Sequence, residues 1–539
     1  MMHETRWVFP LAVLVAACGG RDDEWDAEVG TNPRSYGLTG SVAVLDEPLN
    51  RALVLTSPEE NEVVSRFFSI GRNVAAAQRS PDLERLYVLS RGVEERRKPE
   101  DELPSLTVLD GGAEPEIVHR YTLTDPLLEL VVDPAGQWLA AFDGGSVVNN
   151  PNKLALIDLS DDDRDAWPRT RTLRSFGGTP QSLIFTDELA VPEGPARRFL
   201  VASTEQDLAL VDLERLDRDE VTVRMPAVGG SDETSFAKPA QVVFDDGDPD
   251  VVTDARLAVR LENQSDVVLL ELAPPSTGSD ADFTTTINIV GVGGVPDFIE
   301  FVHTDGGVRL VALIGSQRRA ALIDPATTLV QFVAFDAAYT RLTRVTTDVV
   351  AEPESSDVAL LWSDREAGAA FWSLGSMRGT SFQSVDPIDL PVSISRVIDV
   401  PGSRFGHMKI LESSNAGQFY VLDLAKRETS PMQTEGSGFS VNVSPDGMRA
   451  WAFNANTPSE RFASIRFEDD LDPIPLSVSP PVSAVYDIER GDGGRAALVL
   501  HGSDRSSSPG TLAVTVLGAD APDSAVTRFY GGLLLGGLR

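Results

Sequence analysis

Leu154-Ala155-Leu156-Ile157-Asp158 is an apolar run of strand length that ends in an acid, and similar runs recur along the whole chain. The clearest copies are Leu106 to Asp110, Leu208 to Asp212, Val267 to Glu271 and Ala320 to Asp324, and looser ones follow at Ala369 to Ser373, Tyr420 to Asp423, Ser464 to Phe467 and Leu512 to Val516. From Asp110 to Asp324 the closing acids are separated by 48, 54, 59 and 53 residues. Repeats of this length are typical of solenoids, propellers and arrays.

A second apolar run precedes most of these copies, as at Leu86 to Leu89 and Trp138 to Phe142. These runs are too short and too rich in β-branched and aromatic residues to favour helix. Turn sequences such as Ser80-Pro81-Asp82 and Ser444-Pro445-Asp446-Gly447 come just before several of them, which predicts hairpins. Each unit therefore reads as four antiparallel strands.

Four antiparallel strands in each unit predict an all-β chain, a β-propeller of four-stranded blades. We expect about 8–10 repeat units, in a single large ring rather than two rings. The predicted unit starts are Ser41, Asn73, Leu127, Gln181, Pro239, Asp297, Arg341, Ser393, Gly438 and Ser483. One matched position of the repeat, held by Leu156, Leu210, Leu322 and Val421, should be buried in every unit.

The repeat resembles a known group of propellers. The tract Leu86 to Ser90 after Ser80-Pro81-Asp82, together with the linkers Gly177 to Pro180 and Gly294 to Asp297, looks like the YVTN-type and lactonase-like β-propellers of bacteria. The likeness covers most of residues 41 to 531 and implies a propeller body. It carries little about activity, since propellers host many unrelated functions.

The N-terminus carries the most specific local motif. Trp7 to Ala17 is an apolar run of signal-peptide length, too short to span a bilayer. It ends in Val15-Ala16-Ala17-Cys18, which resembles the lipobox of bacterial lipoproteins, and Cys18 is the only cysteine in the chain. The resemblance implies cleavage before Cys18 and attachment of lipid, palmitate included, to its thiol.

These observations predict three segments: a lipoprotein signal peptide at 1–17, a flexible acidic tether at 18–36 and the propeller at 37–539. In lipoproteins an Asp directly after the lipidated cysteine favours the inner membrane. Gly19 stands there, so the resemblance implies an anchor in the outer membrane more than in the inner one. The expected location is therefore the cell envelope, on the membrane through the lipid.

Composition excludes one class of partner. The chain has 82 acidic against 46 basic residues and a net charge of −36. Such a surface repels phosphate backbones, so we expect no nucleic-acid partner.

Two groups of residues, an acidic run and the histidines, are of the types that bind metal ions. The run Asp245-Asp246-Gly247-Asp248-Pro249-Asp250, with Asp254 beyond, places carboxylates at alternate positions as calcium loops do. It lacks the Gly at the sixth position and the bidentate Glu at the twelfth, so a solvated loop is favoured over a calcium site. The histidines after the predicted cleavage site, His119, His303, His407 and His501, are far apart in sequence. We therefore assign no metal and no cofactor from sequence.

The acids that close the repeat could be mistaken for a ring of catalytic carboxylates. We expect instead that Asp110, Asp158, Asp212, Asp324 and Asp423 accept backbone hydrogen bonds in the turn after each strand.

Two functional classes remain open. The sequence contains no nucleophile elbow, phosphate-binding loop or zinc-protease motif, so we assign no catalytic residue. We therefore favour a binding protein over an enzyme. The first class is a lipid-anchored scaffold or binding propeller for a protein or glycan partner. The alternative is a lactonase-like or metal-dependent hydrolase with its site at the channel mouth, which requires Asp, Glu and His side chains to converge there.

Overall fold

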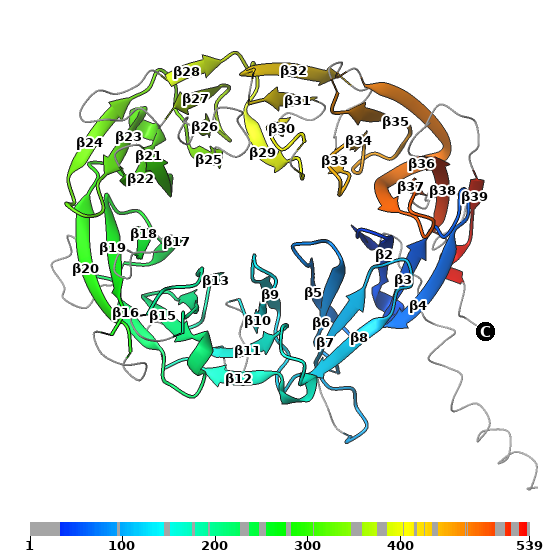
Figure 1. Cartoon of the computed structure of the whole chain (residues 1–539), viewed down its shortest axis with the longest axis horizontal. Helices are drawn as coiled ribbons and strands as arrows, with labels where there is room; N and C mark the ends of the chain where they lie inside the picture. Colours follow the sequence, from blue (N-terminus) through cyan, green and yellow to red (C-terminus); the bar gives the residue numbers. More distant parts are fainter. Residues whose placement is uncertain are drawn as a thin grey trace, which may run out of the picture.

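A computed structural model describes residues 33–93, 98–144, 151–174, 178–191, 195–226, 237–246, 255–275, 282–304, 307–345, 358–373, 385–402, 404–413, 418–424, 426–433, 440–468, 471, 473–501, 512–518 and 528–535. Within them the chain forms eight four-stranded antiparallel sheets and one seven-stranded sheet. Figure 1 shows these sheets arranged around a central opening in a single ring. The all-β class and the single large ring are thus confirmed.

The strands follow one another from the inner edge of each blade to its outer edge. The first five blades are β1 (Arg34–Gly37), β2 (Ser41–Asp46), β3 (Arg51–Thr56), β4 (Val64–Ser69); β5 (Val74–Arg79), β6 (Arg85–Ser90), β7 (Ser105–Asp110), β8 (Ile117–Thr122); β9 (Glu129–Val132), β10 (Trp138–Phe142), β11 (Lys153–Asp158), β12 (Arg169–Thr172); β13 (Ser182–Phe185), β14 (Phe199–Ser203), β15 (Asp207–Asp212), β16 (Val221–Arg224); and β17 (Pro239–Asp245), β18 (Arg256–Leu261), β19 (Asp266–Ala273), β20 (Thr284–Gly291).

The next three blades repeat this order. They are β21 (Phe298–Thr304), β22 (Gly307–Ile314), β23 (Arg319–Ile323), β24 (Val330–Ala334); β25 (Arg341–Val345), β26 (Val358–Trp362), β27 (Ala369–Ser373), β28 (Val385–Ile388); and β29 (Ile394–Asp399), β30 (Met408–Ser413), β31 (Gln418–Asp423), β32 (Glu428–Gln433).

The seven-stranded sheet joins two blades through one long strand. It comprises β33 (Ser440–Val443), β34 (Arg449–Phe453), β35 (Ser459–Arg466), β36 (Ile474–Glu489), β37 (Arg495–His501), β38 (Ala513–Gly518) and β39 (Arg528–Tyr530). The first part of β36 pairs with β35 and its second part, from Val482, pairs with β37. β36 is therefore the outer strand of the ninth blade and the inner strand of the tenth.

The only helical elements in the described residues are short 3-10 turns, namely η1 (Glu47–Leu49), η2 (Arg164–Ala166), η3 (Leu213–Arg215), η4 (Gly315–Gln317) and η6 (Leu533–Leu535). Among those residues there is also no apolar helix of membrane-spanning length. β1 begins at Arg34, three residues before the predicted start of the propeller at 37. The predicted signal peptide and residues 18–32 of the predicted tether lie outside the described residues.

Apolar side chains of neighbouring blades interlock to form the core. For example, Ala258 and Val267 of the fifth blade share one cluster with Ile299 and Leu310 of the sixth. The repeat position that was predicted to be buried is indeed buried, with exposed fractions of 1% for Leu156, 2% for Leu210, 4% for Leu322 and 0% for Val421. Burial of these side chains between neighbouring sheets removes apolar surface from water, which holds the blades of a propeller together.

The closing acids of the repeat act in turns, as predicted. Each accepts a hydrogen bond from a backbone N–H two or three residues later: Gly112 to Asp110 (2.8 Å), Ser160 to Asp158 (2.8 Å), Glu214 to Asp212 (3.1 Å), Ala326 to Asp324 (2.9 Å) and Lys426 to Asp423 (3.0 Å). These carboxylates are therefore structural.

A buried ion pair clamps the third blade to the fourth. Arg198, just before β14, donates from both terminal nitrogens to Asp133 in the β9–β10 turn, at 2.8 and 3.0 Å. Only 5% of the Arg198 side chain and none of the Asp133 side chain is exposed. Arg495 of the tenth blade lies 3.3 Å from Asp446 in the β33–β34 turn of the ninth blade, so a second proline-containing turn also joins two blades.

Among the described strands, the first and tenth blades remain separate sheets where the ring closes. The backbone N–H of Glu489 in β36 donates to the carbonyl of Thr39 (2.7 Å), and the Tyr530 hydroxyl donates to the carbonyl of Asn61 (2.9 Å). Tyr486 and Ser35 are joined through their hydroxyls at 2.9 Å. The first and tenth blades are thus held by side chains and loops.

Candidate functional site

The predicted site residues are dispersed around the ring. His119 lies in the outer strand β8, whereas His303 is the next-to-last residue of the inner strand β21, His407 lies in a turn before β30 and His501 ends β37. The described residues contain no group of three His, Cys, Asp or Glu side chains that could hold a metal ion. Cys18 and residues 247–254 of the acidic run that begins at Asp245 lie outside the described residues.

The structure does bring together two residues that sequence reasoning had named separately. Asp245 ends β17 and His303 lies near the end of β21, and their Oδ1 and Nε2 atoms are 3.1 Å apart. Asp245 is only 5% exposed, and its Oδ2 atom is buried with no hydrogen-bond partner among the described residues. A buried carboxylate oxygen in this position can accept a further donor.

Two further acidic residues lie near this pair. Asp187 follows the inner strand β13, and Asp246 follows Asp245 directly. Burial raises the pKa of Asp246, and the negative charges of Asp187 and Asp245 raise it further, while His303 lowers it. We call Asp187, Asp245 and Asp246, with His303 against Asp245, the acidic rim.

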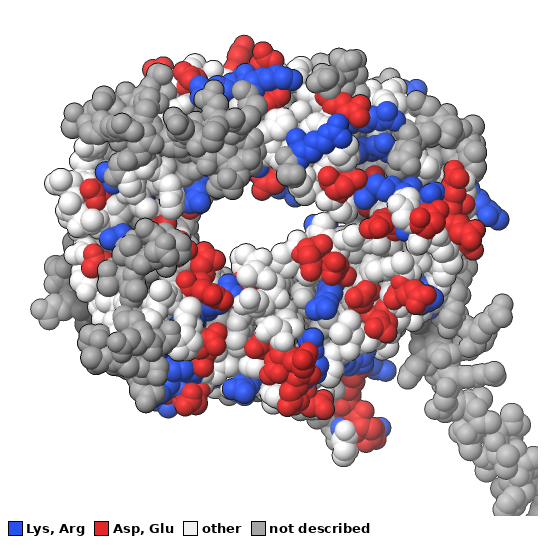
Figure 2. Space-filling view, viewed as in Figure 1, with Lys and Arg blue, Asp and Glu red and all other residues white. Residues whose placement is uncertain are grey.

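The acidic rim lies on the inner side of the ring. Its residues come from the ends of three successive inner strands, which all run in the same direction. Figure 2 shows acidic side chains beside the central opening, over the part of the ring where β13 and β17 lie in Figure 1. The negative charges of Asp187 and Asp245 raise the pKa of Asp246. A bound positive charge would therefore reduce the repulsion between these carboxylates.

Glu300 adds a titrating group to the same strand as His303. It is half-buried on β21, and burial raises its pKa to about 7, helped by Asp245 and opposed by Arg344. Neighbours of Glu300 on its own face of β21, Phe298 and Val302, pack toward the seventh blade, whereas Ile299 packs toward the fifth. Alternation along a strand therefore puts Glu300 and His303 on opposite faces.

Glu300→Gln should stabilise the protein above neutral pH. A carboxyl whose pKa is raised on folding, from 4.5 to about 7, binds more protons when folded, so its contribution to stability falls as pH rises between these values. The variant should gain about 3 kcal/mol over the native protein by pH 8 and almost nothing at pH 4.5. Urea titrations across this range test the prediction, with Glu59→Gln at an exposed turn controlling for the lost charge; a gain that does not depend on pH would contradict it.

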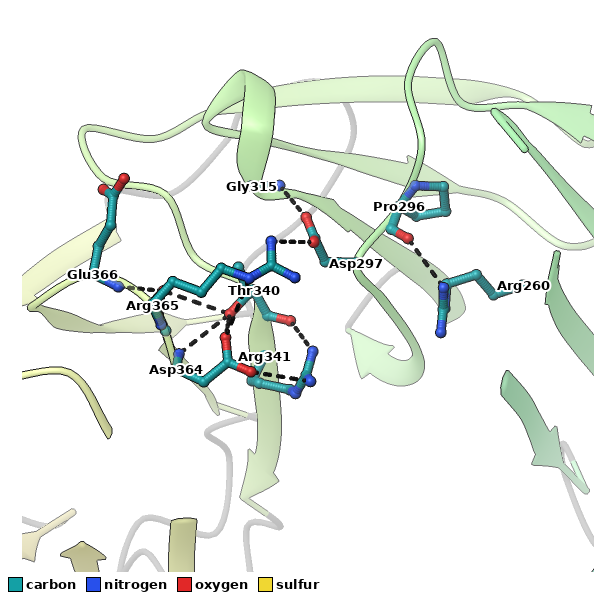
Figure 3. A network of polar contacts seen from close by, with 10 residues as sticks. Arg260, Pro296, Asp297, Gly315, Thr340, Arg341, Asp364, Arg365 and Glu366 are labelled. Atoms are coloured by element: carbon teal, nitrogen blue, oxygen red, sulfur yellow. Dashed lines mark hydrogen bonds and ion pairs between the residues drawn. The ribbon is translucent and has the colours of Figure 1, made fainter. Parts of the chain in front are cut away.

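The opposite end of the same inner strands carries a different polar network, drawn in Figure 3. Asp297, just before β21, accepts from the backbone N–H of Gly315 (2.9 Å) and from Arg365 of the seventh blade (3.0 Å). Asp364 accepts from the Thr340 hydroxyl (2.9 Å) and lies 3.1 Å from Arg341. These bonds tie the loops of the sixth and seventh blades together.

Comparison with known proteins does not assign the chain to a family. No family model matches the chain, and no curated protein matches it. Three similar solved structures are the dihydro-heme d1 dehydrogenase NirN in complex with DHE (15% identity, 89% of this chain and 78% of that chain, TM-score 0.39), Sqt1 of Saccharomyces cerevisiae (11%, 79% and 93%, 0.37) and the Dos1 propeller (14%, 69% and 89%, 0.38). The assignment to the β-propeller class rests on the blades and ring of this chain itself.

Proposed function

We propose that the chain is a lipid-anchored binding module of the cell envelope, in the outer membrane more than the inner one, and that its acidic rim receives a positively charged segment of a protein partner. The rim is the observation that carries this proposal. Asp245 offers a buried oxygen that has no hydrogen-bond partner among the described residues, and Asp246 is held near two like charges. A lysine or arginine side chain would donate a hydrogen bond to the Asp245 oxygen, and its positive charge would offset the negative charges near Asp246. A glycan, the other partner class considered, would supply donors without the charge.

A second candidate function, a hydrolase, draws on Glu300 and on the Asp245–His303 pair. A carboxyl whose pKa is near 7 suits general acid–base work, and an acid can orient a histidine. Proton transfer requires these groups to reach one reacting atom. Since Glu300 and His303 lie on opposite faces of β21, binding accounts for the arrangement better.

Neutralising the acidic rim should weaken the binding of a basic peptide. In calorimetric titrations with hexalysine, the variant Asp187→Asn/Asp245→Asn/Asp246→Asn should bind at least about tenfold more weakly than the native protein, because it loses several charge-assisted contacts. Glu59→Gln/Glu60→Gln/Glu114→Gln removes three exposed acids elsewhere and should bind nearly as well as the native protein. Equal weakening in both variants would mean that the peptide is attracted by net charge alone.

The titration also has an expected pH dependence. Protonation of Asp246 removes charge from the rim, and its raised pKa means that this occurs at higher pH than for an ordinary aspartate. Hexalysine should therefore bind less tightly as pH falls into the mildly acidic range. A hydrolase screen with His303→Ala and Glu300→Gln tests the second candidate, since turnover lost in either variant would favour it.

A further inference from the structure

Arg260 is a half-buried cation on β18 that is poorly satisfied by its surroundings. Its terminal nitrogens lie 3.5 Å from the carbonyl oxygens of Pro296 and Ala240, longer than ordinary N–H···O hydrogen bonds. Its Nε atom is buried and has no hydrogen-bond partner among the described residues. Gln241, its ladder neighbour, bonds the backbone of Ile299, so this face of the blade looks toward the sixth blade.

The nearby carboxylates are engaged elsewhere. Asp297 binds Gly315 and Arg365 through different oxygens, and Asp364 binds Thr340 and Arg341. Glu262 pairs with Lys238 at 3.8 Å. No ion pair in the described part of the chain includes Arg260.

A second arginine stands close by. Arg341, which begins β25, uses two of its donors on Thr340 and Asp364 and keeps others unused by these contacts. In Figure 3 the Arg260 guanidinium lies below Pro296, to the right of Asp297. The Arg341 guanidinium lies below Asp297, beside Asp364. Burial lowers the pKa of Arg260 and the like charge of Arg341 lowers it further, although Asp297 and Glu262 oppose the change.

We propose that Arg260 and Arg341 form a binding site for an anionic oxygen group, a carboxylate or a phosphate, at the end of the inner strands opposite the acidic rim. Two guanidinium groups from the fifth and seventh blades can each donate paired N–H groups to such a ligand. The ligand would pair directly with Arg260, which forms no ion pair within the described part of the chain. The proposal is independent of binding at the acidic rim.

Calorimetric titration of the full-length protein tests the site with two probes, succinate and inorganic phosphate, in buffer without added chloride. At least one probe should bind at millimolar concentration, and the stronger one identifies the ligand class. Arg260→Gln and Arg341→Gln should each weaken that binding at least about tenfold. Arg365→Gln, which removes an exposed arginine of the same network, should change it less than about threefold.

Circular dichroism establishes that each variant is folded, and Arg341→Gln decides the outcome if Arg260→Gln is not. Arg260→Lys keeps the charge but loses the paired donors, so it should bind with intermediate affinity. The proposal is overturned if neither probe binds the native protein, or if Arg365→Gln weakens binding as much as the other two variants do.

Discussion

Arg198→Met should destabilise the protein by about 3 to 5 kcal/mol, because it leaves the Asp133 carboxylate buried without its counter-ion. Arg198 also donates to the Gln137 side chain (2.8 Å) and to the carbonyl of Thr186 (3.2 Å), so the loss extends to both blades. The free energy of unfolding from urea titrations is the measurement.

The double variant Arg198→Met/Asp133→Asn should recover much of that loss. The asparagine oxygen can still accept from the backbone N–H of Ala135, which Asp133 binds at 3.1 Å, but it carries no charge. Arg174→Met removes an arginine whose partner Asp219 is 66% exposed and should cost no more than about 1 kcal/mol. Strictly additive effects at positions 198 and 133 would show that the pair is not a coupled clamp.

Cys18→Ala should remove the lipid anchor from the protein. If Cys18 is the acylated first residue, its chains supply the membrane affinity, at about 0.8 kcal/mol for each buried CH₂ group. Mass spectrometry of the native protein should find a lipid-modified terminus at Cys18, and fractionation should find the variant unprocessed or released.

Gly19→Asp is the matched control for the anchor. It keeps Cys18 and its lipid, so the protein should stay membrane-bound but shift toward the inner membrane. A native protein that begins at Met1 or Met2, or that is soluble without the substitution, would refute the lipoprotein interpretation.

The blades were largely predictable because their signals are local. Strand-length apolar runs and proline-containing turns placed unit starts at Asn73, Gln181 and Pro239, and the inner strands begin at Val74, Ser182 and Pro239. β1 was missed because Arg34-Ser35-Tyr36-Gly37 is short and polar and owes its pairing to β2. The sharing of β36 between two blades also depends on pairing that sequence does not reveal.

The candidate site was only partly predictable because its residues meet through the ring. Asp245 and His303 were singled out, yet 58 residues separate them, and their contact depends on adjacent inner strands ending side by side. Asp187, Glu300 and the Arg260–Arg341 pair were missed. Aligning the ends of the inner strands, where Asp187, Asp245 and His303 fall at similar places, is the signal that could have found the acidic rim.

The most direct test of the binding-module account is photo-crosslinking of a basic peptide to defined positions on the ring. A photoreactive residue at Glu188, exposed next to Asp187, should crosslink biotinylated hexalysine. The same residue at Glu114, exposed in the β7–β8 loop, should not. Labelling at Glu188 that disappears in the Asp245→Asn/Asp246→Asn background is the predicted result, whereas equal labelling at both positions would contradict a binding site at the acidic rim.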